Sequence, residues 1–306
     1  KGSQIFSVYR SDTMCIVFFS AGSKAKQHGY RLILVSNRDE FYSRKTAISS
    51  WNEIHKLEVT GRCLQMISGT DQQEGKEGGT WLGMTKQGRI GILLNVFQGN
   101  KKLQEGSCNV GGRGFIISDF LKWNGSPESF LMQLNEEKDS YQPFHLVTIS
   151  LSKNEEKVHH YCNTPDYQPQ ELKSEIIGVG NHLPNKSWKK VEAGKAALDD
   201  VILKNYPKEL LVEKLFEVVS SNERHFPDHE LESQGLLVEE SILQGISSIF
   251  VKLDNIQYGT RTQTVILIDE NDEVTFVERT FDCTEKFSAL DDAKVTMVQH
   301  QFKLNI

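Results

Sequence analysis

Short apolar runs separated by polar turns dominate the first hundred residues. MCIVFFS at 14–20 and YRLILVSN at 30–37 flank a polar stretch, and together they predict a β-hairpin with a flexible connection. Similar runs follow at 63–68, 80–85 and 89–96, the last two joined by the turn KQG. This part of the chain predicts a sheet of sequential antiparallel strands.

Helical spacing appears at 111–138, where apolar residues recur at intervals of three and four and predict two helices. The same pattern predicts helices at 187–203 and 208–220. The stretch at 220–235 is polar and contains a proline, so it predicts a long surface loop. Further strands are predicted at 145–151, 157–162, 175–179, 247–253, 262–269, 274–279 and 294–302, with DENDE as a hairpin turn.

The elements follow one another as strands, helices, strands, helices and strands, without regular βαβ alternation. That order predicts an α+β fold, a four-layer αββα sandwich of two antiparallel sheets between helical layers. No linker or change of composition divides the chain, so we expect one domain at 14–306. Two domains with a split near residue 170 are the alternative.

The chain has 306 residues, a formal net charge of −6 and a pI near 5.9. This balance argues against nucleic acid or an anionic membrane surface as the main partner. No apolar run approaches the roughly 20 residues that cross a bilayer. Residues 1–13 contain no long apolar stretch and do not resemble an intact secretory signal, so we interpret them as a tag remnant, a native extension or a trimmed targeting sequence.

The five cysteines are widely spaced and form no CxxC pair, which predicts neither a disulfide framework nor a zinc site. Cysteines that form no disulfide framework fit a reducing compartment best. The nine histidines form neither HExxH nor CxxCH, so we expect no dedicated metal site. A transient axial ligand for haem iron, from His, Cys or Met, stays open.

Cys15 follows Met14 at the head of the first apolar run. A cysteine at the start of a chain can act as a nucleophile, because its own free α-amine takes up the thiol proton. Retention of residues 1–13 would convert that amine into an amide without basicity. Catalysis at Cys15 therefore depends on where the natural chain begins.

The stretch SNRDEF ends the second predicted strand with concentrated polar groups. Because strand side chains alternate, Asn37 and Asp39 are expected on one face and Arg38 and Glu40 on the other. One pair can face a ligand while the other supports the structure. A solvated strand end is the simpler interpretation of the spacing alone.

Three further positions carry candidate chemistry. Gly78 and Gly79 precede Trp81, a combination that suits either a pocket wall or a tight hairpin with a core tryptophan. Asn181 follows a glycine-flanked strand and either donates to an oxyanion or caps the helix near residue 187, and local sequence favours the cap. Arg261 at the mouth of a strand either binds a carboxylate or pairs with Asp39 or Glu40.

MCI, SNRDEFYSR, EGGTWLG, the glycine-flanked Asn181 and YGTRTQTVILID occur in the order and spacing of the NRDE-motif family, also called the transport and Golgi organisation protein 2 family. The chain resembles this family from Met14 to about residue 300. The resemblance implies a fold like that of the N-terminal nucleophile (Ntn) hydrolases. Residues 1–13 lie outside the pattern, in which the Met-Cys pair begins the chain.

By resemblance to the cysteine amidases with that fold, Cys15 matches the nucleophile, Asp39 the carboxylate that orients its amine, and Asn181 the oxyanion donor. Arg261 matches the arginine near the thiol, and Arg38 a second arginine near the substrate. The family is better associated with intracellular haem movement and with Golgi and lipid homeostasis. The resemblance therefore leaves enzyme activity open and inclines against it.

The first functional hypothesis is a haem-trafficking protein without another cofactor. Trp81 and Phe41 would contact the macrocycle, and Arg38 or Arg261 would meet the propionates. The ligand site of this hypothesis is completed by Asn37, Gly78 and Gly79. Haem donor or acceptor proteins are the expected partners.

Two other functions stay open. The alternative is an N-terminal cysteine amidohydrolase or acyltransferase that cleaves C–N bonds or thioesters. A Golgi or organelle organisation factor, or a lipid-homeostasis factor, is the second alternative. The expected location is the cytoplasm, with mitochondrial or Golgi association possible.

Overall fold

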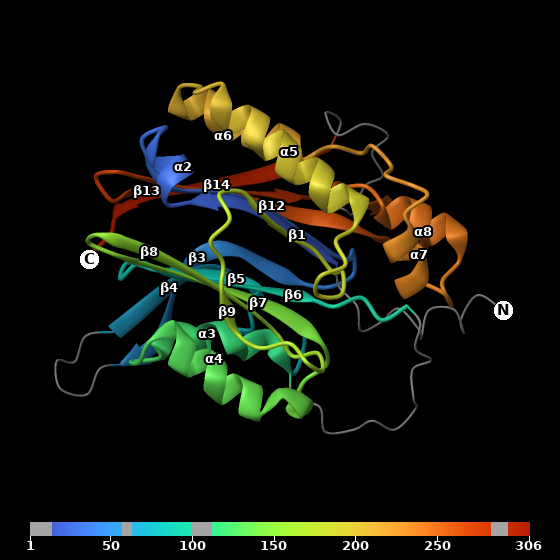
Figure 1. Cartoon of the computed structure of the whole chain (residues 1–306), viewed down its shortest axis with the longest axis horizontal. Helices are drawn as coiled ribbons and strands as arrows, with labels where there is room; N and C mark the ends of the chain where they lie inside the picture. The colour runs from blue at the N-terminus through green and yellow to red at the C-terminus, as the bar shows by residue number, and fades with distance from the viewer. Residues whose placement is uncertain (1–13, 57–62, 100–111, 283–292) are drawn as a thin grey trace.

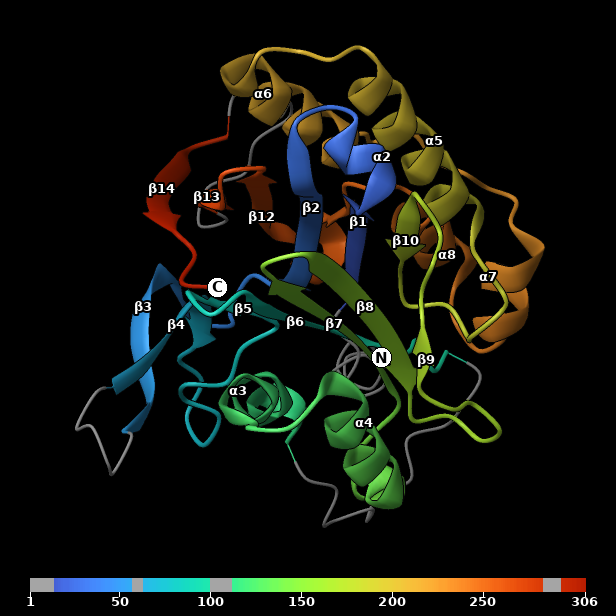
Figure 2. The same cartoon turned by 60° about the vertical axis from the view of Figure 1, so that its left-hand side comes forward.

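The computed structural model describes residues 14–56, 63–99, 112–282 and 293–306 (Figure 1). Two antiparallel sheets, each of seven strands in this part of the chain, lie face to face. Helices cover the outer surface of each sheet, as the turned view in Figure 2 also shows. The predicted α+β class with two antiparallel sheets between helical layers is confirmed.

The first sheet contains the strands nearest both ends of the described chain. Its order is β10 (Ile177–Val179), β1 (Cys15–Ala21), β2 (Tyr30–Phe41), β12 (Tyr258–Asp269), β13 (Glu273–Phe281) and β14 (Val295–Lys303), with β11 (Lys252–Leu253) paired to β12. The second sheet runs through the middle of the sequence. Its order is β3 (Thr46–Lys56), β4 (Cys63–Asp71), β5 (Leu82–Thr85), β6 (Arg89–Asn95), β7 (Phe144–Ser152), β8 (Glu155–Cys162) and β9 (Gln170–Glu171).

The helices divide between the two outer surfaces and one end of the molecule (Figures 1 and 2). Those over the first sheet are α5 (Lys189–Leu203) and α6 (Lys208–Val219), with the short α2 (Ser23–Lys26) in the β1–β2 connection. Those under the second sheet are α3 (Ile116–Lys122) and α4 (Pro127–Glu136), and those at the end are α7 (His229–Gln234) and α8 (Glu240–Ile246). Single 3₁₀ turns occur at Arg113–Phe115, Lys138–Ser140 and Asp254–Ile256.

Three apolar layers hold these elements together. One lies between the first sheet and its helices, one between the two sheets, and one beneath the second sheet. Alternation along β1 explains the division, because Phe18 belongs to the helix-side layer while Val17 and Phe19 belong to the layer between the sheets. Both faces of β1 are therefore buried.

Several predicted elements need correction. The predicted strand at 247–253 is wrong except for the two residues of β11, because its buried apolar residues pack against the core as a loop after α8. The predicted loop at 220–235 contains α7, whose N-cap is Asp228. The sequence pattern also missed β3, a strand with mixed exposure and two irregularities in its pairing with β4. The predicted 14–37 hairpin and the sequential order of β4, β5 and β6 are confirmed.

The inner face of the first sheet changes from apolar to polar at one level of four adjacent strands. The apolar row consists of Phe19, Leu34, Ile266 and Phe276. The next two rows along the same face consist of Val17, Ser36, Thr264 and Glu278, and of Cys15, Arg38, Thr262 and Thr280. Polar side chains therefore occupy one end of the space between the sheets, where an ordinary core would be apolar.

Glu278 joins the two sheets at this level. Its Oε1 accepts a hydrogen bond of 2.7 Å from the backbone nitrogen of Ser49 in β3, and the residue is only 3% exposed. Burial raises the pKa of Glu278 from its ordinary value of 4.5 to about 7. The fold therefore favours the neutral carboxyl over the carboxylate.

The pKa of Glu278 predicts a stability that depends on pH. Because the folded value lies above the unfolded one, the contribution is fully present below about pH 4.5 and is lost as the pH rises through 7. The difference corresponds to roughly 3 kcal/mol. We expect urea unfolding to show a steeper loss of stability between pH 5 and 8 in the wild type than in Glu278→Gln. The exposed Glu270→Gln should keep the wild-type slope, and equal slopes in all three proteins would contradict the assignment.

Packing between α5 and β1 gives a second prediction. A Cβ added to Gly194 would lie 2.0 Å from Cζ of Phe18, far inside contact distance. Alanine gains about 1 kcal/mol of helix propensity over glycine, but overpacking a core costs about 1–3 kcal/mol or more. Gly194→Ala should therefore lower the free energy of unfolding measured in denaturant. Gly112→Ala meets no atom within 4 Å and should leave stability near the wild-type value, so equal effects of both changes would refute the packing argument.

Candidate functional site

Cys15 stands at the first position of β1, where backbone and side-chain groups from three segments meet it. Its backbone nitrogen donates to Oδ1 of Asn181 at 3.0 Å. The preceding Met14 donates through its nitrogen to the hydroxyl of Tyr258 and accepts from the nitrogen of Asp39 at 2.8 Å. Cys15 is 7% exposed and Met14 is 3% exposed, so the Met-Cys peptide is built into the fold.

Burial governs the chemistry of the Cys15 thiol. Removal from water is the main cause that raises its pKa to about 12, and the nearby carboxylate of Asp39 acts in the same direction. Arg38 opposes this shift to a smaller extent. The sulfur is therefore a neutral thiol at physiological pH, and a thiol is a weaker nucleophile and metal ligand than a thiolate.

Arg38 lies opposite Cys15 in the pairing of β1 with β2. Its guanidinium carbon is 4.1 Å from the ring centroid of Trp81, within the range of a cation–π contact. Nη2 of Arg38 contacts the carboxylate of Glu40 at 3.3 Å, and Glu40 also pairs with Arg44 at 3.0 Å. Nη1 of Arg38 is buried and has no hydrogen-bond partner among the described residues. One donor group of this arginine is therefore unsatisfied.

Asp39 projects to the other face of β2, as the predicted alternation requires. Its Oδ1 accepts from the hydroxyl of Thr260 at 2.6 Å, while its buried Oδ2 has no partner in the described part of the chain. Burial raises the pKa of Asp39 to about 7, and the strongest opposing effect comes from Lys190. Asn37 lies on the same face and donates to the carbonyls of Val219 and Ile249. The predicted division of these polar residues between two faces is confirmed.

Lys190 is a buried cation that the sequence pattern did not single out. It is 1% exposed, and its Nζ donates to the carbonyls of Ile246 at 2.8 Å and Ser248 at 3.2 Å. Burial lowers its pKa to about 8, against the favourable effect of Asp39. Its position in the first turn of an amphipathic helix resembles that of a surface lysine, so no local signal identified it.

Asn181 is fully buried and forms hydrogen bonds with several segments around the site, whereas the local sequence favours a helix cap. Besides accepting from Cys15, its Nδ2 donates to the carbonyl of Asn95 at 2.7 Å. Its own carbonyl accepts from the nitrogen of Phe97 and from Nε2 of Gln234. The interpretation of Asn181 as a helix cap is wrong, because α5 begins later and the nitrogen of Lys189 is satisfied by Asp228 instead.

Arg261 and Phe41 lie near the end of β2 but have other partners. Nη1 of Arg261 donates to the carbonyls of Phe41 and Arg44, so this arginine supports the turn between β2 and β3. It forms no ion pair with Asp39 or Glu40 within the ranges that the structure describes. The ring of Phe41 packs edge-on against Tyr258 and belongs to the helix-side layer. Phe41 and Trp81 therefore lie in different apolar layers.

The two glycines before Trp81 shape the loop that carries it. Gly78 has a φ of 84°, which favours glycine, and is exposed. Gly79 packs against the backbone of Gly114, where an added Cβ would lie 3.1 Å from Cα. The ring of Trp81 closely approaches Gly69, contacts the layer between the sheets and remains partly exposed. The glycines thus position the indole, and Trp81 is both a packing residue and the partner of Arg38.

A directed chain of hydrogen bonds joins the buried His145 and His160 to the half-buried Tyr167. The Nε2 of His145 donates to the carbonyl of His182 at 2.7 Å, so its Nδ1 accepts from Nε2 of His160 at 2.9 Å. Nδ1 of His160 then accepts from the hydroxyl of Tyr167. Burial lowers the pKa of His160 to about 3 and holds that of His145 well below its ordinary value, so both rings stay neutral. This chain supports the backbone next to Asn181, a role visible only once β7 and β8 are paired.

The described residues contain no group of three or more His, Cys, Asp or Glu side chains arranged to hold a metal ion. His159 and His160 face opposite sides of β8, as expected for neighbours in a strand: His159 pairs with Glu128 while His160 points inward to His145. Cys15 and Cys162, both buried, form no disulfide within the described ranges. No helix in the described ranges is long and apolar enough to span a bilayer.

Comparison of the sequence with known proteins assigns the chain to a family. The family model described as Transport and Golgi organisation 2 matches residues 14–283. A mouse relative named Transport and Golgi organization 2 homolog is 34% identical over 270 residues, covering 87% of this chain and 92% of its own. A cattle homologue is 33% identical and covers 95% of this chain and 99% of its own, and the fruit fly protein is 30% identical with coverages of 87% and 92%.

Solved structures were found at much lower identity. A variant of conjugated bile acid hydrolase from Clostridium perfringens is 10% identical, with a TM-score of 0.44 and coverage of 94% of this chain and 97% of that one. Penicillin V acylase from Agrobacterium tumefaciens is 12% identical, with a TM-score of 0.37 and coverages of 86% and 82%. The strand pairings alone establish the two-sheet architecture. Because the family model spans most of the sequence, the chain belongs to the Transport and Golgi organisation 2 family.

Proposed function

We propose that this protein binds and moves haem as a cargo, and that Arg38 and Trp81 receive the polar edge of the ligand. The observation that carries the proposal is the unpaired Nη1 of Arg38, which is buried in a residue only 5% exposed. An unsatisfied buried donor costs about 1–3 kcal/mol, and more when it is charged. A carboxylate, such as a haem propionate, would supply the missing acceptor.

The neighbours of Arg38 suit a ligand that must be released. Trp81 is partly exposed and offers an aromatic surface to a flat ring, while its contact with Arg38 fixes the position of the guanidinium. Cys15 provides a sulfur nearby, but its pKa of about 12 keeps the thiol protonated. A protonated thiol binds iron weakly, and weak ligation permits transfer to an acceptor.

The geometry narrows the ligand contacts expected from the sequence. Phe41 belongs to the helix-side layer, so the proposal assigns it to support of β2 and gives the ring contact to Trp81. Nη1 of Arg261 holds backbone carbonyls, whereas its buried Nε has no hydrogen-bond partner among the described residues. The proposal gives the propionate to Arg38, because only Arg38 of the two also contacts Trp81. Asn37 ties β2 to its helical cover, and Gly78 with Gly79 shapes the Trp81 loop, as described above.

Haem titration tests this proposal. Wild-type protein should give a saturable shift of the Soret band and pass haem to an apo-acceptor. Arg38→Met removes a charge-assisted hydrogen bond worth about 1.5–3 kcal/mol, so haem affinity should fall roughly 10- to 150-fold. Arg89→Met removes a partly buried arginine from β6 and serves as the matched control. A wild type without saturable binding, or a folded Arg38→Met protein with unchanged affinity and transfer, would sink the proposal.

A cysteine amidohydrolase or acyltransferase is the second candidate, favoured by the bond between the Cys15 nitrogen and Asn181. With a free α-amine, that nitrogen would take the thiol proton and the sulfur would attack an amide carbonyl. The C–N bond would break, the amine would leave with the proton, and water would hydrolyse the thioester. Oδ1 of Asn181 accepts from the Cys15 nitrogen and so orients it. Nδ2 donates one of its two hydrogens to the carbonyl of Asn95, so the second hydrogen remains for the developing oxyanion.

The second candidate requires cleavage before Cys15. A chain whose first residue is Cys15 should form a covalent thioester with an acylating probe, detected by intact mass, and Cys15→Ala should abolish it. The chain that retains Met14 and the residues before it should react much more slowly, because its thiol is protonated and its nitrogen is an amide. Cys162→Ala removes another buried free cysteine as the control. Equal labelling of both chain forms at Cys15 would argue against this mechanism.

The proposal also covers where the protein acts in the cell. The names of the mouse and fruit fly relatives refer to transport and Golgi organization. For this chain we propose action in the cytoplasm, with mitochondrial or Golgi association through haem donor or acceptor proteins. A role in Golgi or organelle organisation is the second alternative.

A further inference from the structure

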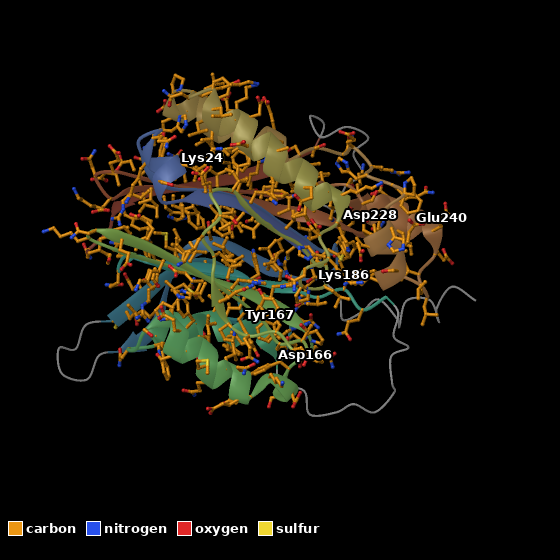
Figure 3. All side chains as sticks on the ribbon, viewed as in Figure 1. Lys24, Asp166, Tyr167, Lys186, Asp228 and Glu240 are labelled. Carbon is orange, nitrogen blue, oxygen red and sulfur yellow. The ribbon has the colours of Figure 1, made fainter. Side chains whose placement is uncertain are left out.

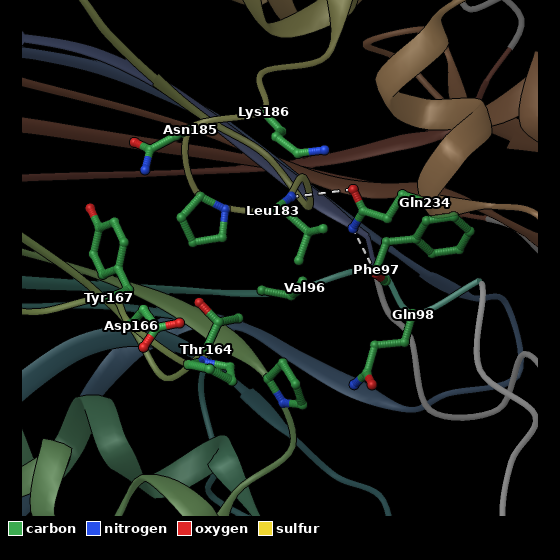
Figure 4. A pocket seen from close by; sticks show the side chains of 13 residues that line it. Val96, Phe97, Gln98, Thr164, Asp166, Tyr167, Leu183, Asn185, Lys186 and Gln234 are labelled. Carbon is green, nitrogen blue, oxygen red and sulfur yellow. Dashed lines mark hydrogen bonds between the residues drawn. The ribbon is translucent and has the colours of Figure 1, made fainter.

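A cavity of about 400 Å³ opens where three loops meet beside α7 (Figure 4). The loops follow β6, β8 and β10 and contribute residues 96–98, 164–167 and 183–186. Gln234 of α7 forms part of the wall. The volume lies within the range of about 300–1,000 Å³ that is usual for small-molecule sites.

The buried polar groups in the wall are already satisfied from within the protein. Nε2 of Gln234 donates to the carbonyls of Phe97 at 2.6 Å and Asn181 at 3.0 Å. Its Oε1 accepts from the nitrogen of Leu183 and from Nε1 of Trp188, both at 3.2 Å. Two of these bonds are visible in Figure 4. These four bonds use both hydrogens and both oxygen lone pairs of the Gln234 amide, which therefore acts as a rigid part of the wall.

The hydroxyl of Tyr167 is also hydrogen-bonded within the protein. Its hydroxyl donates to His160 and accepts from Gln170, so both of its main hydrogen-bonding functions are used. The wall then presents mainly the apolar surfaces of Val96, Phe97 and Leu183, along with prolines from neighbouring segments. A molecule inside the cavity would gain by burying an apolar body rather than polar groups.

The mouth of the cavity carries charges of both signs. Lys186 and Asp166 lie on different walls, as Figure 4 shows, and both are exposed. Lys186 already pairs with Glu230 at 3.4 Å, whereas no ion pair of Asp166 exists within the described ranges. The uncompensated charge at the mouth is therefore negative and favours a cationic group.

Backbone conformation fixes the polar residues at this mouth. Asp166 and Asn185 have φ values of 65° and 64°, in the left-handed region, on two different loops. Asp and Asn tolerate this region better than other residues with side chains. The turn before Tyr167 is closed by the bond from the Tyr167 nitrogen to the carbonyl of Thr164. Asp166 is thus presented by a defined turn, and Figure 3 shows it close to Tyr167.

We infer that this cavity is a second ligand site, which takes a small lipophilic amine with its apolar body inside and its ammonium group at Asp166. The inference does not depend on haem binding or on a nucleophilic Cys15. The Gln234 bonds connect the site to Asn181, so it lies beside the Cys15 site and has its own chemistry.

Two naphthyl probes of matched size test the inference. Equilibrium dialysis of the full chain at pH 7 should show that 2-(1-naphthyl)ethylamine binds about two- to fivefold more tightly than 1-naphthylacetate, the range of one exposed ion pair. High salt should reduce this preference. Asp166→Asn keeps a residue that tolerates the turn and should remove the preference, whereas Asp254→Asn, a partly exposed aspartate elsewhere, should keep it.

A cavity-filling change separates this site from general surface binding. Thr164→Trp places an indole at the partly exposed edge of the cavity and should weaken both probes at least about tenfold while the thermal midpoint stays near wild type. Leu183→Trp serves the same purpose from another wall if Thr164→Trp does not fold. The inference is overturned if the amine does not bind the wild type, if the carboxylate binds as tightly, or if a folded cavity-filling variant binds normally.

Discussion

The hydrogen bond from the Cys15 nitrogen to the buried amide of Asn181 is the interaction on which the site depends. Through its other groups, Asn181 also holds Asn95 at the end of β6 and Gln234 of α7. One carboxamide therefore connects the first strand, the second sheet and the end helices. Because every one of these partners is a backbone or amide group, the connection does not vary with pH.

Polarity inside the sandwich is the second constraint. The fold places Arg38, Asp39 and Glu278 where an ordinary core would hold apolar side chains, and burying charge without full compensation is costly. The protein meets part of this cost by shifting the pKa values of Asp39 and Glu278 toward neutrality. Two of the unsatisfied buried atoms, Nη1 of Arg38 and Oδ2 of Asp39, lie on opposite faces of β2. Such residual polarity is typical of functional sites and is the physical basis for proposing a ligand there.

The arrangement also limits how Cys15 can act. Its neighbours are well placed to orient a nitrogen, but burial suppresses thiolate formation in a chain that still carries Met14. The same environment suits weak, reversible ligand contact. A carrier would use Arg38 and Trp81, and a hydrolase would use Cys15 and Asn181, with Cys15 and Arg38 paired across β1 and β2. The hydrolase would also require a free α-amine at Cys15.

The sequence by itself determined the layered α+β fold, because strands and helices differ in the period of their apolar residues, two in a strand and 3.6 in a helix. It also determined the two faces of Asn37 to Glu40, since alternation is local, and it identified Cys15, Arg38, Asp39 and Trp81 through motifs. Only the tertiary structure decided that Asn181 binds Cys15 rather than a helix, that Phe41 belongs to another layer, and that Lys190, Glu278 and Gln234 belong near the site. Those contacts join residues far apart in the chain, and their partners are chosen by strand register and layer packing, which a local pattern does not contain.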